Sequence, residues 1–304
     1  MPATLQAFIA IFFLGALLRS SGLLVKIHAE RLAFVVFSIS LPATILVSLD
    51  RVVFAPTAWK LPLAAGLVTL SMLLCSWPVT RLLHLPRATR GGFLLGTGCI
   101  NSVYFAYPVV LATLGDKGLA QAILFDLGQT TLTLTVIYGL AVWHGARSAT
   151  ARSAMLRFVS SPPLWALCLS LLLTLLERHL PGWLHDTLTP IHLTTTPLAS
   201  LVLGLSISFS AVRRTWALAL LGVGMRMIGG LLLGFAVAYG LDLAGMERAI
   251  VILVAAMPSA VTAVIFATDT GLDEDLVTSI VALSICVGVA LLPWLPQLLF
   301  LLAG

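Results

Sequence analysis

Two apolar stretches of the chain carry polar and helix-breaking residues where a membrane helix would be continuous. Residues 91–115, GGFLLGTGCINSVYFAYPVVLATLG, and residues 249–271, AIVILVAAMPSAVTAVIFATDTG, are each long enough to cross a bilayer, which takes about 20 apolar residues. The first contains Asn101 and Pro108, and the second contains Pro258. Proline removes a backbone donor and an amide is costly in hydrocarbon, so such segments are tolerated only inside protein or beside a wet cavity.

An interrupted membrane helix exposes backbone groups that can bind ions. The N–H groups at the start of the second half-helix carry partial positive charge, and the carbonyls at the end of the first carry partial negative charge. Two breaks that meet near the bilayer midplane would place two positive ends around one point, which suits a carboxylate. We therefore expect a binding site for a small organic anion, lined by the residues at the two breaks: Asn101, Ser102, Tyr104, Pro258, Ser259 and Thr262.

Three further residues could support this site or couple it to an ion. Asp126 lies in the apolar segment 119–143, with Gln129 one helical turn later on the same face. An acid at membrane depth costs about 2.5–3.5 kcal/mol on insertion scales, so Asp126 could carry a proton, form a structural pair or lie near the interface. Arg226 lies near the middle of segment 215–239 and could neutralise Asp126, hold a substrate carboxylate or bind a lipid phosphate.

The composition is that of a polytopic membrane protein. Of the 304 residues, 60% are hydrophobic and 10% are charged, the mean hydropathy is +1.08, and a soluble domain carries about 25% charged residues. The net charge of +5 is spread over short loops, so no nucleic-acid partner is expected. Ten apolar segments can be drawn, at residues 4–18, 32–49, 59–83, 91–114, 119–143, 162–177, 187–209, 215–239, 248–268 and 276–302.

The ten segments form two halves of five that resemble each other. Pro42 in the second segment and Pro197 in the seventh occupy matching places. Because five is an odd number, the second half must enter the membrane from the opposite side, which predicts an inverted repeat. The expected division is a first repeat at 1–145, a cytoplasmic linker at 146–160 and a second repeat at 161–304.

The positive residues of the loops predict the orientation. With the N-terminus outside, the inner loops hold eleven Lys and Arg residues and the outer loops hold five, while Arg226 lies within a segment. We therefore predict a multi-pass plasma-membrane protein, in a bacterial inner membrane, with both termini on the outer, periplasmic side. The N-terminal stretch lacks a basic n-region and a cleavage site, so it is interpreted as a retained first span.

The sequence shows no cluster of residues typical of an enzyme. There is no HExxH motif and no pair of closely spaced aspartates within the apolar segments. We expect no catalytic residue, no metal and no cofactor, and an intramembrane enzyme is the remote alternative.

His192, close to a segment end, is interpreted as an interfacial residue. The cysteines lie in apolar runs without a CxxC pair and are interpreted as core residues: Cys75, Cys99, Cys168 and Cys286.

Three motifs resemble those of a known family. INSVYFAYPVVLATLG resembles the fourth-span motif of the auxin efflux carrier family, and MPSAVTAVIFATDTGLDEDL resembles its ninth-span signature. FDLGQ is similar to the fifth-span Asp-Leu-Gly-Asn run of prokaryotic members. The resemblance implies an all-α carrier of ten transmembrane helices, a 5+5 inverted repeat with broken crossing helices four and nine, similar to bile-acid symporters and NhaA. The crossing would lie in a transport domain that moves against a scaffold of spans one, two, six and seven.

Known members of this family carry carboxylates, such as malonate and malate permeases in prokaryotes and PIN-type auxin exporters in plants. The resemblance matches Asn101 to the substrate-facing asparagine and Pro258 to the crossover proline of span nine. Ile100 stands where plant carriers have a proline, and Thr262 stands where span nine has an asparagine, so the substrate stays open.

These observations together predict a secondary transporter of a mono- or dicarboxylate that works by an elevator-type mechanism. The expected partners are the carboxylate, the lipid bilayer, a proton carried by Asp126 as coupling ion and a second copy of the chain in a homodimer. Transport driven only by the membrane potential is equally allowed. A sodium-coupled symporter of the bile-acid type on the same fold is the alternative, and it would need a cage of oxygen ligands.

Overall fold

The chain folds as an all-helical membrane protein. The computed structural model describes residues 2–24, 26–50, 52, 56–147, 156, 159–207 and 211–295. Most of the expected linker 146–160 and the last residues of the tenth expected segment therefore lie outside the described residues. Within the described ranges, seven helical runs are long and apolar enough to cross a bilayer: Ala3–Ser20, Ile27–Leu49, Lys60–Leu82, Ser102–His144, Gly182–Ser206, Val212–Gly240 and Glu274–Trp294.

The seven long runs are fewer than the ten expected segments for visible reasons. Ser102–His144 is one run of 43 residues and covers parts of two expected segments. The apolar helices Pro162–Leu175 and Val261–Thr270 contain only 14 and 10 residues. The multi-pass membrane class is confirmed, and the count of ten spans and the inverted repeat stay predictions.

The helices form two compact units whose sequences alternate along the chain. Unit 1 contains Met1–Ala58, Val103–Ile123 and Leu156–Ile207, and unit 2 contains the rest. The predicted division at residue 145 separates two repeats of the sequence, whereas the two units are defined by which helices pack together. The units therefore do not test the repeat, which stays a prediction.

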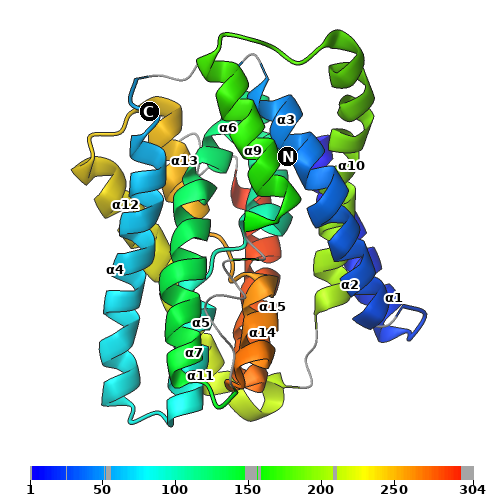
Figure 1. Cartoon of the computed structure of the whole chain (residues 1–304). Helices are drawn as coiled ribbons and strands as arrows, with labels where there is room; N and C mark the ends of the chain where they lie inside the picture. The colour runs from blue at the N-terminus through cyan, green and yellow to red at the C-terminus, as the bar shows by residue number, and fades with distance from the viewer. Residues whose placement is uncertain are drawn as a thin grey trace. The chain divides into compact units, whose positions relative to one another are not determined.

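Unit 1 is built from helices that pack along one another. Its helix α10 packs against α1, α2 and α3, and α3 also packs against α9; Figure 1 shows α1 and α2 beside the lower part of α10. The α1–α10 contact is close because both helices place glycine in it: a Cβ at Gly204 would lie 2.2 Å from the carbonyl oxygen of Phe12. The helices of unit 1 are α1 (Ala3–Ser20), α2 (Lys26–Val35), α3 (Leu41–Leu49), α9 (Pro162–Leu175) and α10 (Gly182–Ser206).

Unit 2 contains most of the remaining helices. Its helix α15 packs against α11, α5 and α14, while α12 packs against α13 and α4; α14 and α15 lie side by side in Figure 1. These helices are α4 (Lys60–Leu82), α5 (Arg87–Gly98), α7 (Tyr138–His144), α11 (Val212–Gly224), α12 (Gly230–Gly240), α13 (Gly245–Ala255), α14 (Val261–Thr270) and α15 (Glu274–Leu291).

A buried apolar cluster holds α5, α11 and α15 together in unit 2. Phe93 of α5 and Ile280 of α15 lie at its centre with no exposed surface. A Cβ at Gly96 would lie 2.9 Å from Cδ1 of Ile280, and one at Gly222 would lie 2.7 Å from the same atom. Small residues on α5 and α11 therefore let the helices approach closely and fix α5, whose end forms one of the breaks.

Helix α6 (Tyr107–Leu132) begins in unit 1 and ends in unit 2. It bends at Gly115, which has φ 65° and ψ −167°, a conformation that glycine adopts readily. The bend lies between the expected segments 91–114 and 119–143.

Among the described residues, three π-helical turns lie inside the long helical runs, and a fourth, Ser102–Ala106, begins one of them. Such turns place an extra residue in the helix and occur frequently at functional sites. One of them carries Arg226 and another carries Thr133. The three turns are Val36–Ser40, Thr133–Ile137 and Met225–Gly229.

Candidate functional site

The two interrupted helices meet at their breaks within unit 2. Helical structure stops at Gly98 at the end of α5 and at Ala255 at the end of α13. Between the half-helices, Ile100 lies opposite Ser259 in an isolated antiparallel backbone bridge. The breaks therefore fall where the Gly, Asn and Pro residues of the sequence predict them, and the two segments meet there; we call this meeting point the crossing.

Two backbone hydrogen bonds flank the bridge. The N–H of Asn101 donates to the carbonyl of Pro258 at 2.9 Å, and the N–H of Ala260 donates to the carbonyl of Cys99 at 3.2 Å. Each break thus supplies partners for backbone groups that the other break has freed, which a bilayer requires of any non-helical segment.

Ser259 ties the crossing to two neighbouring helices. Its hydroxyl donates to the carbonyl of Gly96 at 2.6 Å, and its own N–H donates to the hydroxyl of Ser284 at 3.0 Å. The side-chain amide of Asn101 donates to the Ser259 carbonyl at 3.4 Å. Ser259 and Asn101 are both buried, so the predicted pair of polar residues is brought together, and Ser284 of α15 joins them.

Arg226 lies at the ends of both first half-helices. It has no exposed surface. One terminal nitrogen donates to the carbonyl of Thr97 at 2.9 Å, and the other donates to the carbonyl of Ala255. Its Nε–H has no hydrogen-bond partner among the described residues. The sequence suggested Asp126, a substrate carboxylate or a lipid phosphate as the partner of Arg226. The structure shows two backbone carbonyls as its partners instead.

Gln129 links Asp126 to the crossing. In the amide orientation that satisfies both of its ends, the nitrogen of Gln129 donates to Oδ1 of Asp126 at 3.2 Å. Its oxygen then accepts from the N–H of Ile100 and from the hydroxyl of Thr133, both at 3.0 Å. The predicted Asp126–Gln129 pair is therefore in contact and reaches the backbone of the first break.

The other predicted residues have different surroundings. Ser102 is buried, and its hydroxyl has no hydrogen-bond partner in the part of the chain that the structure describes. The hydroxyl of Tyr104 donates to the carbonyl of Ala33 at 3.3 Å within unit 1. Thr262 lies on the first turn of α14 with its side chain exposed.

The second half-helices begin beside the bridge. Ser102 starts the π-helical turn Ser102–Ala106 that leads into α6, and Val261 starts α14. Each start lies two residues beyond the bridge pair Ile100 and Ser259. The first N–H groups of a helix carry partial positive charge and can bind anions, so each break has an electropositive helix start within two residues of the bridge.

His192 belongs to a buried polar group in unit 1. Its Nδ1 lies 3.2 Å from Oγ1 of Thr44, whose hydroxyl lies 2.7 Å from that of Thr195. Its Nε2 lies 3.6 Å from Oδ1 of Asp116. The side chain is buried and satisfied by these contacts, and its position near a membrane interface stays a prediction.

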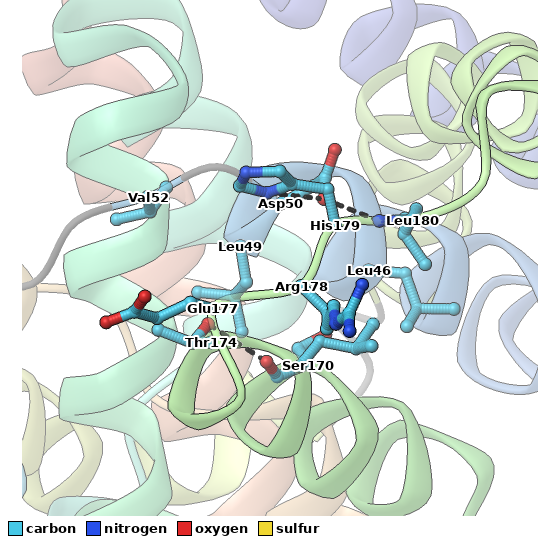
Figure 2. A pocket seen from close by; sticks show the side chains of 11 residues that line it. Leu46, Leu49, Asp50, Val52, Ser170, Thr174, Glu177, Arg178, His179 and Leu180 are labelled. Carbon is cyan, nitrogen blue, oxygen red and sulfur yellow. Dashed lines mark hydrogen bonds and ion pairs between the residues drawn. The ribbon is translucent and has the colours of Figure 1, made fainter.

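A cavity of about 430 Å³ lies within unit 1, between the end of α3 and the turn after α9. Figure 2 shows the Asp50 carboxylate beside His179 and Leu180. Its Oδ1 accepts the N–H of Leu180 at 3.0 Å and lies 3.8 Å from Nδ1 of His179. Asp50 therefore closes the turn after α9, and no residue selected from the sequence lines this cavity.

Comparison with known proteins decides the family. A family model described as membrane transport protein matches residues 3–295. The chain belongs to this family, the auxin efflux carrier family. It is 29% identical over 294 residues, 95% of each chain, to an uncharacterized transporter of Methanothermobacter thermautotrophicus. It is 27% identical over 267 residues, 85% of each chain, to an uncharacterized transporter of Methanocaldococcus jannaschii.

The family and these relatives are transporters and not enzymes. Among the described residues, no group of three or more His, Cys, Asp and Glu side chains is placed to hold a metal ion.

Replacing Ser259 with alanine is expected to destabilise the crossing. The change leaves the Gly96 carbonyl without the Ser259 hydroxyl, and losing a buried hydrogen bond costs about 1–3 kcal/mol. The melting temperature in detergent should fall. Ser200→Ala is the matched control, because the Ser200 hydroxyl is equally buried but donates only within its own helix, to Thr196 and Pro197. Equal melting temperatures for the two variants would contradict the assigned role.

Proposed function

We propose that the transporter moves a small organic anion, a mono- or dicarboxylate, across the membrane. The observation that carries this proposal is the start of two helices, at Ser102 and Val261, beside one backbone bridge. Two electropositive ends attract a carboxylate without needing a mobile cation. The buried Ser102 hydroxyl adds a donor that the described part of the chain leaves unused, which favours a ligand at this place.

The proposed architecture has ten spans in an inverted repeat. The run Ser102–His144 contains 43 residues, about 65 Å of helix, which is enough for the second half of an interrupted span and one full pass through a bilayer of about 30 Å. Its bend at Gly115 gives a place where the chain turns back. The excess of Lys and Arg in alternate loops supports an orientation with both termini on the outer side, and we assign the transporter to the plasma membrane, as in a bacterial inner membrane.

An elevator-type movement fits the division into two units. Unit 1 contains the first, second, sixth and seventh expected segments, the set that the family resemblance assigns to a static scaffold. Unit 2 contains the crossing together with the third, eighth, ninth and tenth segments, while the fourth and fifth segments are divided between the two units. We take unit 2 as the part that carries the substrate and unit 1 as the part that forms a homodimer.

Uptake into proteoliposomes tests the substrate class. A panel of mono- and dicarboxylates, including malonate, malate and indole-3-acetate, should contain at least one compound that accumulates, and neutral amides of the same size should not. Ser102→Ala should weaken apparent affinity by about tenfold, the effect of one lost hydrogen bond to a charged group. Its melting temperature should stay unchanged, because no described residue bonds the Ser102 hydroxyl.

The control for this experiment is Ser200→Ala, which removes a buried hydroxyl of unit 1. It should leave the apparent affinity unchanged. If no carboxylate is accumulated, or if Ser102→Ala transports every accumulated compound with wild-type affinity, the proposed site is wrong.

A second prediction concerns proton coupling through Asp126. Asp126→Asn keeps the side-chain size and can still bond Gln129 but cannot exchange a proton. It should abolish accumulation driven by a pH gradient and preserve exchange of substrate at equal pH on both sides. Accumulation by the variant that still follows the pH gradient would remove Asp126 from the mechanism.

A further inference from the structure

The two carbonyl ends at the crossing share one positively charged partner. Thr97 lies in the last turn of α5, and Ala255 is the last residue of α13. Both carbonyls accept from the guanidinium of Arg226, at 2.9 Å for Thr97. Arg226 thus joins the ends of two half-helices that lie far apart in the sequence.

These two helix ends carry partial negative charge. The last carbonyls of a helix have no partner within the helix, and the helix dipole adds to their negative potential. In transporters with interrupted helices, such half-helix ends and unwound carbonyls are the groups that coordinate a coupling Na⁺ or proton. In this protein a cation that belongs to the chain already holds both ends.

The surroundings of Arg226 are shaped for this contact. Gly230 follows one helical turn later, at the start of α12. A Cβ at Gly230 would lie 2.1 Å from the Ala255 carbonyl oxygen and 2.6 Å from a terminal nitrogen of Arg226. Only glycine leaves room there for the carbonyl and the guanidinium to meet. The π-helical turn Met225–Gly229 carries Arg226 at this point.

We propose that Arg226 is a built-in cation that takes the place of a coupling metal ion at the crossing, so that transport needs no Na⁺. The assignment rests on the proposed function, because it names the ion dependence of the same site. It makes Arg226 a positioning residue: it holds α5 and α13 in the arrangement that leaves the two electropositive helix starts open to the substrate. The positive charge stays at the site throughout the transport cycle.

The test uses the full-length protein in lipid nanodiscs and in proteoliposomes. Wild-type protein should have the same melting temperature in sodium chloride and in choline chloride of equal ionic strength. Substrate uptake should also be equal in the two salts. Arg226→Gln should lower uptake by at least about tenfold, the effect of one lost charge-assisted hydrogen bond, because it removes two such bonds. Na⁺ should raise the melting temperature of this variant but not that of the wild type. The reason is that the Thr97 and Ala255 carbonyls of the variant are open to a cation.

Two variants serve as controls. Arg226→Lys keeps the charge and should remain insensitive to Na⁺, with uptake between those of wild type and Arg226→Gln. Arg213→Gln removes an exposed charge near the start of α11 and should behave as wild type in both salts.

Three results would overturn the inference. These are a Na⁺-dependent melting temperature or uptake in the wild type, wild-type uptake in Arg226→Gln, and no gain of Na⁺ response in that variant. The melting temperatures require no substrate, so they test the inference even if the carboxylate proposal fails. The wild-type comparison stays decisive if Arg226→Gln does not fold.

Discussion

Backbone N–H and C=O groups must be paired inside a bilayer, and this constraint shapes the centre of the molecule. A continuous helix meets it within its own segment, whereas each of the two interrupted helices frees several groups at membrane depth. The structure pairs one break with the other through the bonds Asn101–Pro258 and Ala260–Cys99. Neither break would be tolerated alone, so the pairing of the two breaks is a condition of stability.

The partial negative and partial positive helix ends at the crossing have different partners. The carbonyl ends of α5 and α13 are held by Arg226, and the helix starts at Ser102 and Val261 keep their electropositive character. What remains for a ligand is therefore mainly positive potential. The proposed anionic substrate uses this potential, and the family to which the chain belongs is one of membrane transporters.

Sequence reasoning located the breaks because glycine, proline and asparagine are incompatible with an uninterrupted membrane helix. That argument is local and needs only residue types, and it brought Asn101, Pro258 and Ser259 together correctly. It could not choose a partner for Arg226, because the choice depends on which helix ends lie within reach. The π-helical turns that carry Arg226 and Thr133 leave no reliable signal in the sequence. Likewise, Ser284 was missed because a single serine in an apolar segment is indistinguishable from other small residues.

Cross-linking across the bridge tests the crossing most directly. The flanking hydrogen bonds make Ile100 and Ser259 a non-hydrogen-bonded pair, with Cα atoms about 4.5 Å apart, within disulfide range. The double variant Ile100→Cys with Ser259→Cys would carry a protease site in the linker 146–160, and Ile100→Cys with Ala267→Cys, two helical turns along α14, is the control. All native cysteines would first be replaced: Cys75, Cys99, Cys168 and Cys286.

After mild oxidation and cleavage, the Ile100–Ser259 variant should run as one full-length band without reductant and as two fragments with it. The control pair should separate in both conditions. Fragments of the Ile100–Ser259 variant that separate as completely as those of the control would contradict the account, because the two interrupted helices would then not meet at their breaks.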